Sequence, residues 1–522
     1  MTYPRKYNAV TDFVDSHIGK DTENKTAFID STRHITYGEL ANQTHRVANL
    51  LQAYGLRMED RVALLAHDTV DWPVIFWGAI RAGVIPTALN TLLGQEQYQY
   101  ILADTRARAL FISQALLDVV MPILSSLPHL KHVFVLDCED PKPEHGYYSF
   151  THTLAAQSER FESQGQSVTQ AVADTCCDDV AFWLYSSGST GMPKGVPHVH
   201  TSPAETAKRF GQEVMGIRPD DVVFSAAKFF FAYGLGNALT FPMFVGATTV
   251  LWPARPTPQT VFNILKQHQP SIFYGVPTLY AAMLAHPDCG PDLSSPRLRL
   301  CVSAGEALPE EVGKRWKALF AVDILDGVGS TELLHIFLSN RPEDVRYGSS
   351  GKAVPGYELR LIDEHGAPAA VGEIGELLVN APSAAVGYWN QREKTRATFE
   401  GEWTRTGDKY TIDEQGYYYY CGRTDDMFKV SGIWVSPFEV ESALIAHSAV
   451  LEAAVVGFED ENGLTKPKAF VVLKHDAKPP TFDELKQWVK EKVGKWKYPR
   501  EIEFATELPK TATGKIQRFK LK

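Results

Sequence analysis

Short apolar runs that end in glycine turns alternate with helical segments up to about residue 310, and this alternation limits the fold most strongly. The runs RVALLAH (61–67), RALFIS (108–113), SIFYGV (271–276) and LRLCVSAG (298–305) have the length and composition of buried strands. WPVIFWGAIRAG (72–83) has the pattern of a helix that ends in a glycine. Strands that alternate with helices form a parallel sheet, whose ligands bind at the carboxyl ends of strands. We therefore expect the chemistry of this chain in the glycine turns.

The pattern changes after about residue 350. ELRLIDEHGAP (358–368) and GELLVN (375–380) are typical of antiparallel strands joined by glycine turns. SPFEVESALIAH (436–447) predicts a helix with Ser436 as its N-cap and a proline in its first turn. We predict a large domain over residues 1–424 and a small α+β domain over residues 425–522.

The charge and the cysteines narrow the function class. The chain has 522 residues, with 62 acidic and 52 basic side chains, a net charge of -10 and a pI of about 5.9. A nucleic-acid binder normally carries a basic face, so we expect no nucleic-acid partner. Six scattered cysteines suggest neither a disulfide framework nor a zinc site and favour a reducing cytosol.

Residues 229–252 form an uncharged stretch of 24 residues, long enough to cross a bilayer. Four internal glycines and prolines interrupt it, and Lys228 and Arg255 flank it. We expect a buried loop–helix–strand passage and no membrane span.

The stretch YSSGSTGMPKGVPHVH (185–200) has the composition of a loop that binds phosphate, with Lys194 as a point charge. It differs from the phosphate loop of nucleotide hydrolases, since Gly195, not a hydroxyl residue, follows the lysine. The alternative is a flexible surface turn. Hydroxyls and freed backbone N–H groups would come from Ser186, Ser187, Gly188, Ser189, Thr190 and Gly191.

A second cluster, DGVGSTELLH (326–335), places Ser330, Thr331 and Glu332 after a glycine turn and before a run that we expect to be helical. A carboxylate beside hydroxyls suits Mg²⁺, which takes few carboxylates plus phosphate oxygens. The alternative is an ordinary capped helix start.

Three further motifs are weaker when each is taken alone. EWTRTGDKY (402–410) contains Asp408 after a glycine, and GRTDDMFKVSG (422–432) contains Arg423 and two adjacent acids. The segment LPKTATGKIQRFKLK (508–522) is a basic tail. Their simpler interpretations are a turn, a linker with a salt bridge and a solvated end.

The order and spacing of these motifs together resemble the adenylate-forming superfamily, which contains acyl- and aryl-CoA synthetases, peptide-synthetase adenylation domains and luciferases. The resemblance covers nearly the whole chain and includes GYWN (387–390). Residues 228–242, KFFFAYGLGNALTFP, are most similar to those of benzoate–CoA ligases and their aryl relatives. The resemblance implies an α/β large domain with layered sheets plus a small β-barrel subdomain, followed by a small mobile α+β domain.

The resemblance implies nucleotide contacts across the large domain. The glycine-rich loop would close over the β- and γ-phosphates of ATP, Glu332 would bind Mg²⁺ and Thr331 would contact the α-phosphate. Asp408 would accept the ribose hydroxyls beside Arg423. The residues expected along the adenine are Ala304, Gly305, Glu306, Asp326, Gly327, Val328, Gly329 and Ser330. Many relatives have tyrosine where this chain has Val328, so ring stacking on adenine is lost.

The resemblance makes Lys515 the adenylation lysine, which would bridge the attacking carboxylate and the α-phosphate. Asp425 would be the hinge about which the small domain rotates after adenylation. The rotation would bring Ser431, Gly432 and Trp434 to the CoA side. The position of Trp434 is often polar in relatives, and its role stays open.

The acyl pocket is predicted from flat and small residues in FFFAY and its surroundings, which suit a small planar acid. Plain core packing is the alternative. His335 either binds the substrate carboxylate by a charge-assisted bond or is a satisfied core histidine. His198 and His200 have no visible metal partners, which favours a structural or gating role. The predicted acyl contacts are Ala232, Tyr233, Gly234, Gly329 and His335.

We therefore expect a cytoplasmic ATP-, Mg²⁺- and CoA-dependent ligase that activates benzoate, or a close small aromatic acid, through an acyl-AMP. The alternatives are a ligase for a hydroxybenzoate, an aminobenzoate or a medium-chain fatty acid, and an adenylation domain that loads a carrier protein. A phosphotransferase lacks support because the G-K-[ST] pattern is absent, and a non-catalytic nucleotide binder would not need Lys515, Asp408 and Glu332. The partners are small molecules. The oligomeric state stays open, with a homodimer as one option.

Overall fold

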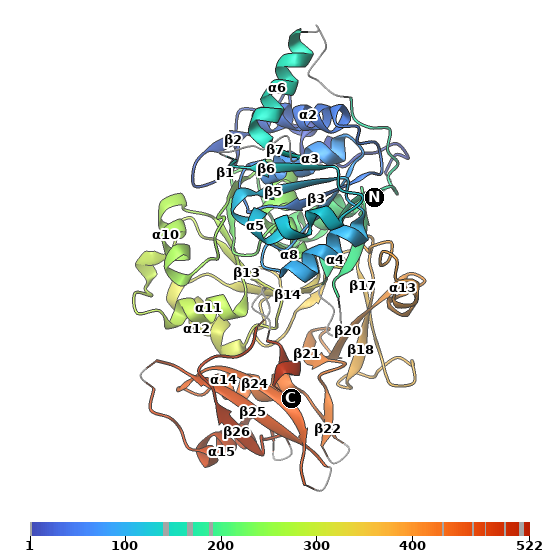
Figure 1. The fold of residues 1–522 in the computed structure, drawn as a ribbon. Helices are drawn as coiled ribbons and strands as arrows, with labels where there is room; N and C mark the ends of the chain where they lie inside the picture. The colour runs from blue at the N-terminus through green and yellow to red at the C-terminus, as the bar shows by residue number, and fades with distance from the viewer. Residues whose placement is uncertain are drawn as a thin grey trace.

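The computed structural model describes residues 3–138, 146–163, 171–186, 192–430, 433–461, 464–475, 477–494, 497–510 and 516–521. The fold is mixed α/β, with a large N-terminal domain and a small C-terminal domain below it in Figure 1. This confirms the predicted fold class.

The first sheet has seven strands, parallel except for its edge strand β9, which is antiparallel to β8. β3 and β5 fall within the runs predicted as buried strands. In spatial order the strands are β7 (Tyr147–Ser149), β6 (His132–Leu136), β5 (Ala109–Ser113), β3 (Arg61–Leu65), β4 (Ile85–Ala88), β8 (Val180–Ser186) and β9 (Lys194–Val199).

The second sheet has nine strands, with a parallel centre and antiparallel strands at both ends. β12 and β13 lie within the runs predicted as buried strands. In spatial order the strands are β16 (Lys352–Ala353), β15 (Ile336–Ser339), β14 (Ile324–Gly329), β13 (Leu300–Ser303), β12 (Ile272–Gly275), β10 (Val222–Ser225), β11 (Thr248–Val250), β1 (Thr26–Ile29) and β2 (His34–Thr36).

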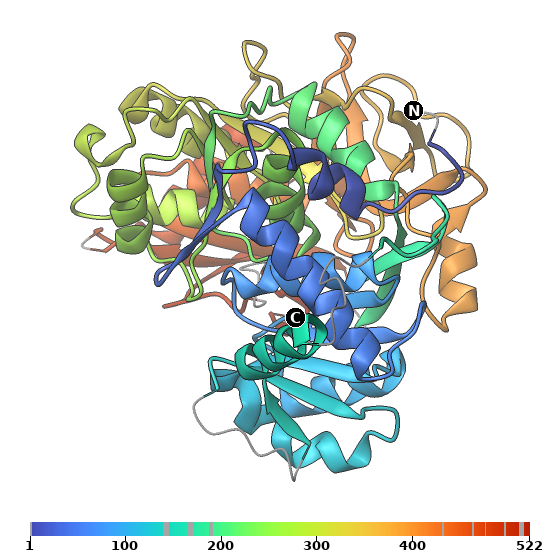
Figure 2. The same cartoon turned by 90° about the horizontal axis from the view of Figure 1, so that it is seen from above.

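The region predicted as a small barrel is a five-stranded antiparallel sheet. Figure 2 shows the three sheets on separate sides of the large domain, with this sheet in light orange. Its strands are β17 (Glu358–Ile362), β18 (Gly375–Asn380), β20 (Trp403–Ile412), β19 (Phe399–Glu400) and β21 (Tyr418–Arg423).

Helices cover the sheets of the large domain. α3 spans the predicted helix and all of its residues are buried, with Gly83 beyond its end at φ 70°. The helices are α1 (Val10–Phe13), α2 (Tyr37–Ala53), α3 (Asp71–Arg81), α4 (Gln95–Thr105), α5 (Leu117–Val120), α6 (Phe150–Ser163), α7 (Ser202–Thr206), α8 (Ala232–Leu235), α9 (Phe241–Val245), α10 (Pro258–His268), α11 (Pro277–Ala285), α12 (Glu310–Phe320) and α13 (Arg392–Thr398).

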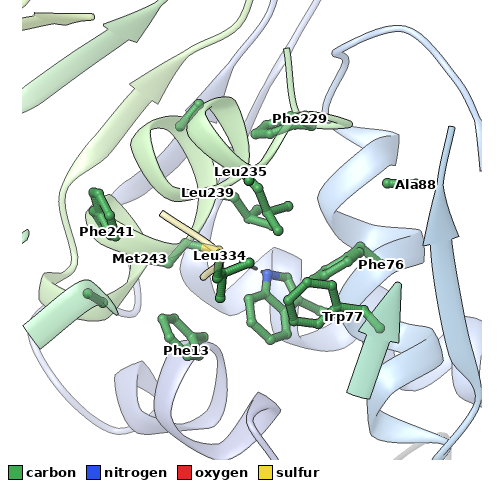
Figure 3. Close-up of a cluster of buried hydrophobic side chains, with 14 of the residues drawn as sticks. Phe13, Phe76, Trp77, Ala88, Phe229, Leu235, Leu239, Phe241, Met243 and Leu334 are labelled. Carbon is green, nitrogen blue, oxygen red and sulfur yellow. Dashed lines mark hydrogen bonds between the residues drawn. The ribbon is translucent and has the colours of Figure 1, made fainter. Parts of the chain in front are cut away.

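The uncharged stretch is the buried passage that we predicted. α8, a π-helical segment η6 (Gly236–Thr240) and α9 follow one another without a break and lead into β11. Their apolar side chains pack against α3 and α1, where Trp77 Nε1 lies 3.1 Å from Met243 Sδ (Figure 3). In the part of the chain that the structure describes, no helix is both long enough and apolar enough to span a membrane.

The C-terminal domain has its own apolar core, built from residues between Val430 and Ile502. The predicted helix α14 (Pro437–Ile445) begins after Ser436, whose hydroxyl accepts from the Glu439 N–H at 3.1 Å. The remaining elements are β22 (Phe428–Val430), β23 (Ile433–Val435), β24 (Val450–Glu459), β25 (Thr465–Leu473), α15 (Phe482–Val493) and β26 (Glu501–Phe504).

One predicted helix is wrong. The run after Glu332 is a turn that leads into β15, so Glu332 and His335 do not share a helical face. Leu334 has φ 68°, which a right-handed helix excludes. The carbonyls of residues 331–333 accept from groups far away in the chain, described below, and the Thr331 carbonyl also accepts from the Leu334 N–H at 3.2 Å.

Candidate active site

The predicted site residues gather where β12, β13 and β14 end and where the hairpins β8–β9 and β20–β21 approach them. The β8–β9 hairpin pairs Ser186 with Lys194, so the glycine-rich loop is its connection. Ser187, Gly188, Ser189, Thr190 and Gly191 lie outside the described residues.

Glu332 lies at the base of this hairpin. Its Oε1 accepts from the Tyr388 hydroxyl at 2.8 Å and from the Ser186 hydroxyl at 3.4 Å. Lys194 Nζ is 3.8 Å from the same oxygen and 4.2 Å from the centre of the Tyr388 ring. Burial lowers the pKa of Lys194, and the Glu332 carboxylate opposes that shift. The hairpin base therefore joins one cation to one carboxylate.

The turn that carries Glu332 is fixed by distant residues. His198 Nε2 lies 2.8 Å from the Thr331 carbonyl oxygen, and the Ala385 N–H donates to the Glu332 carbonyl at 2.8 Å. The Ser383 hydroxyl donates to the Leu333 carbonyl at 2.8 Å. Since a carbonyl only accepts, His198 carries its proton on Nε2 and contacts the main chain of this turn.

Asp408 and Arg423 face each other across β20 and β21. Arg423 Nη1 is 3.0 Å from Asp408 Oδ1 and also donates to the Thr406 carbonyl at 2.9 Å. Asp408 raises the pKa of the Arg423 guanidinium, which therefore stays charged. Gly407 has φ 71°, a conformation that favours glycine and lets the chain turn before Asp408. The ion pair and the turn thus fix the position of the Asp408 carboxylate.

The predicted adenine-side residues follow β13 and form β14. Gly305 has φ 96°, and Val328 and Gly329 end β14. Asp326 is buried, and its Oδ1 accepts from the Leu308 N–H at 3.3 Å. Burial raises the pKa of Asp326 well above its ordinary value. Asp326 therefore ties the loop after β13 to β14.

The C-terminal domain reaches the same loop. The Ile516 N–H donates to Glu306 Oε1 at 3.0 Å, a contact between residues 210 positions apart. Lys515 lies outside the described residues, but its neighbour is thus placed at the predicted nucleotide loop. Ser431 and Gly432 also lie outside the described residues, as does the side chain of Trp434.

The predicted acyl residues meet at α8 and the turn after β14. The Tyr233 hydroxyl donates to the Val302 and Gly275 carbonyls at 3.0 and 3.2 Å. His335 Nε2 lies 3.2 Å from the Tyr233 carbonyl and 3.2 Å from Asn237 Oδ1. Ala232 is buried beside them at the start of α8.

Glycines allow these residues to pack closely. A Cβ at Gly236 would collide with the His335 ring, and one at Gly234 would collide with the Lys228 carbonyl. A Cβ at Gly329 would lie 2.5 Å from the His335 carbonyl. The backbone therefore leaves no room for side chains at these positions.

The charge-assisted bond predicted for His335 does not fit this arrangement. Burial lowers the pKa of His335 to about 3, so the ring is neutral near pH 7. The Tyr233 carbonyl only accepts, so the ring proton is on Nε2 and Nδ1 can only accept. A neutral ring with that tautomer offers no donor to a carboxylate. His335 is instead a buried neutral ring that packs against the Phe210, Tyr233 and Phe241 rings.

Mg²⁺ is compatible with the donor set at Glu332. In the described part of the chain no group of three metal-binding side chains exists. Mg²⁺ usually takes one or two carboxylates and completes its shell with phosphate oxygens and water. A single carboxylate beside the glycine-rich hairpin fits that requirement.

Tyr388 and Ser383 are site residues that the sequence reasoning missed. GYWN was noticed only as part of the resemblance, and a tyrosine in an aromatic motif carries no chemical signal of its own. The contact with Glu332 joins residues 56 positions apart, which no local pattern indicates.

Three buried histidines predict a loss of stability in acid. Burial lowers the pKa of His335 to about 3 and the pKa values of His198 and His200 to about 4. The unfolded chain binds these protons below about pH 6.5 whereas the folded chain does not, so stability falls as pH drops from 6.5 to 4. Each histidine contributes about 1.4 kcal/mol per pH unit in that window.

Urea unfolding at several pH values measures this slope. His200 accepts from the Ala9 N–H at 3.2 Å, and His200→Asn removes its titration. In the variant, we expect the free energy of unfolding to change less steeply with pH, by about 1.4 kcal/mol per pH unit, because one fewer proton binds on unfolding. An unchanged slope in the variant would contradict the neutral state of His200.

Comparisons with known proteins agree with the geometry. The family described as AMP-binding enzyme matches residues 16–389, and the AMP-binding enzyme C-terminal domain matches residues 439–515. The chain is 55% identical over 523 residues to a benzoate–CoA ligase of Thauera aromatica, covering 99% of this chain and 96% of that protein. It is 53% identical over 521 residues to a 4-hydroxybenzoate–CoA/benzoate–CoA ligase of Rhodopseudomonas palustris, and the match covers 99% of this chain and 94% of that protein.

Among solved structures, the crystal structure of the anthranilate CoA ligase AuaEII in complex with anthranoyl-AMP has a TM-score of 0.93 to this fold. It is 45% identical and covers 99% of this chain and 97% of that chain. The similarity thus extends over both domains.

Proposed function

Because the chain belongs to the AMP-binding enzyme family, we propose that it is an AMP-forming benzoate–CoA ligase. One arrangement carries the proposal: the Glu332–Lys194 pair lies within electrostatic reach of the Asp408–Arg423 pair. Ile516 of the C-terminal domain also donates to Glu306 in the loop after β13. The full-length identity to a protein named benzoate–CoA ligase supports the acid that we assign.

The first half-reaction forms benzoyl-AMP. A carboxylate oxygen of benzoate attacks the α-phosphorus of ATP, the α–β P–O bond breaks, and pyrophosphate leaves. Asp408 accepts from both ribose hydroxyls, Thr331 donates to the α-phosphate, and Ser186 with the rest of the hairpin loop steadies the leaving group. Mg²⁺ at Glu332 would neutralise phosphate charge.

Lys515 acts at the moment of attack. Negative charge builds on the α-phosphate, and an ammonium between this group and the carboxylate lowers the barrier by orientation and charge. The contact between Ile516 and Glu306 supports this role, because Ile516 directly follows Lys515 in the chain and is bonded to the loop predicted to bind the nucleotide.

The second half-reaction forms the thioester. The CoA sulfur attacks the carbonyl carbon of benzoyl-AMP, the C–O bond to the phosphate breaks, and AMP leaves with the proton released to solvent. We propose that the small domain, residues 425–522, first rotates about Asp425, which withdraws Lys515 and brings Ser431, Gly432 and Trp434 to the thiol. The separate cores of the two domains support a boundary near Asp425.

A small planar acid fits the wall made by Ala232, Tyr233 and His335. The Tyr233 hydroxyl is turned away to two backbone carbonyls, and the neutral His335 ring packs 4.4 Å from the Phe241 ring. These contacts leave an apolar, aromatic surface that favours an unsubstituted ring over a polar one. We therefore expect this surface to disfavour the hydroxyl or amino group of a substituted benzoate.

Product analysis with a panel of acids tests the proposed function. With benzoate and ATP alone we expect benzoyl-AMP and pyrophosphate, and with CoA added we expect benzoyl-CoA and AMP. We also expect a higher kcat/KM for benzoate than for aminobenzoates, 4-hydroxybenzoate or hexanoate. ADP as product would refute adenylation. Acyl-AMP formation without any reaction with CoA would indicate loading of a carrier protein instead.

A further inference from the structure

Tyr388 contacts the two charged groups at the base of the glycine-rich hairpin. Its hydroxyl donates to Glu332 Oε1 at 2.8 Å, and its ring centre lies 4.2 Å from Lys194 Nζ. Tyr388 is 8% exposed, so this face of the ring is closed to solvent. Neither the nucleotide roles proposed above nor the hinge uses this residue.

The contacts of the Glu332 carboxylate fall on one oxygen. Among the described residues, the recorded donors to it are Tyr388, Ser186 and Lys194, and all three approach Oε1. The Tyr388 hydroxyl is the nearest of the three donors. Among the residues that the structure describes, no donor to the other oxygen, Oε2, is recorded.

Tyr388 is itself firmly placed. Its N–H donates to the Thr395 hydroxyl at 2.9 Å, and its ring packs at 5.5 Å against the Phe399 ring. The next residue, Trp389, donates its N–H to the Gly195 carbonyl at 2.9 Å, beside Lys194. A fixed hydroxyl can therefore impose one orientation on the glutamate.

The same segment also holds the backbone of Glu332. The Ala385 N–H donates to the Glu332 carbonyl, and the Ser383 hydroxyl donates to the next carbonyl, that of Leu333. Residues 383–388 therefore fix both the main chain and the side chain of the glutamate. A glutamate side chain that is free to rotate loses rotamer entropy when it binds a ligand, and fixing it beforehand removes that cost.

We propose that Tyr388 is the positioning residue for the metal-binding carboxylate: its hydroxyl holds Glu332 Oε1 so that Oε2 faces the Mg²⁺ that accompanies ATP. This inference rests on the proposed function, because it takes Glu332 as the Mg²⁺ ligand. Groups that orient a metal ligand change metal affinity by about 10–100-fold when they are removed.

Calorimetric binding of an ATP analogue tests this role without turnover. The analogue has a methylene group between the α- and β-phosphorus atoms, so it cannot be cleaved, and it is titrated with saturating Mg²⁺ and with EDTA. The ratio of the two Kd values measures the coupling between Mg²⁺ and nucleotide. Tyr388→Phe keeps the ring under Lys194 and removes only the hydroxyl.

We expect Tyr388→Phe to reduce this coupling ratio by about tenfold while the affinity in EDTA stays within about twofold of the wild type. In a Glu332→Gln background the same substitution should have no further effect, because the carboxylate is gone.

Tyr98→Phe is the matched control, because the Tyr98 hydroxyl is also buried but donates to the Asn90 carbonyl, away from Glu332. It should leave the coupling ratio unchanged. In the otherwise wild-type protein, an unchanged coupling ratio in Tyr388→Phe overturns the proposal. A loss of nucleotide affinity that is equal with Mg²⁺ and with EDTA also overturns it, whether Glu332 is present or replaced by Gln. If the wild type shows no coupling between Mg²⁺ and nucleotide, the proposed function fails instead.

Discussion

Lys515→Ala is expected to lower benzoyl-AMP formation by about 10²–10³-fold while leaving the second half-reaction largely intact. The residue would act only while charge builds on the α-phosphate, so its loss should not affect attack of the thiol on a finished adenylate. Pyrophosphate exchange dependent on benzoate measures the first step. Thioester formation from supplied benzoyl-AMP and CoA measures the second.

Lys520→Ala provides the control for Lys515→Ala. Lys520 is an exposed lysine of the same terminal segment, and its ammonium lies 5.9 Å from the Phe519 ring centre. The substitution Lys520→Ala therefore removes the same charge without removing a recorded contact to the site. Both half-reactions should keep their rates in this variant. Unimpaired pyrophosphate exchange in Lys515→Ala would rule out the proposed role.

Asp425→Pro is expected to preserve benzoyl-AMP formation and to reduce thioester formation to a small residual rate. Proline fixes φ near -65° and would block the rotation that brings residues 431–434 to the site. In the described residues no hydrogen bond from the Asp425 N–H is recorded, whereas Thr424 and Asp426 donate to Gly407 and Arg423. In the present orientation of the small domain, Asp425→Pro therefore removes no recorded backbone hydrogen bond.

Asp425→Ala separates the hinge from the carboxylate. It removes the side chain but keeps the backbone free, so both half-reactions should continue. Single-turnover measurements of adenylate and thioester formation distinguish the two variants. Equal survival of both steps in Asp425→Pro would disprove the hinge.

Much of the fold follows from local sequence patterns. The apolar run at 61–67 contains β3, and the capped pattern at Ser436 predicts the start of α14 correctly. Both depend on periodicity and on hydrogen bonds between near neighbours, which a sequence displays directly. The uncharged stretch at 229–252 is likewise recognisable from its glycines and prolines as a buried passage of short elements.

The turn after Thr331 shows where local reasoning ends. Its sequence favours a helix start, but the carbonyls of residues 331–333 accept from His198, Ala385 and Ser383, which lie in other elements. These distant contacts outweigh a helical propensity that amounts to tenths of a kcal/mol per residue. The sequence left the role of His335 open for a related reason, since its burial comes from residues that no short window contains.

The three glycines around His335 have a consequence for redesign of the substrate range. Gly234, Gly236 and Gly329 sit against main chain or ring atoms that cannot yield, so mutant libraries that vary these codons would be dominated by misfolded clones. Variation at Ala232 and Tyr233 keeps the backbone intact. In the proposed acyl pocket, directed evolution toward larger or more polar acids would therefore proceed from Ala232 and Tyr233, and this restriction limits which new acids the scaffold can accept.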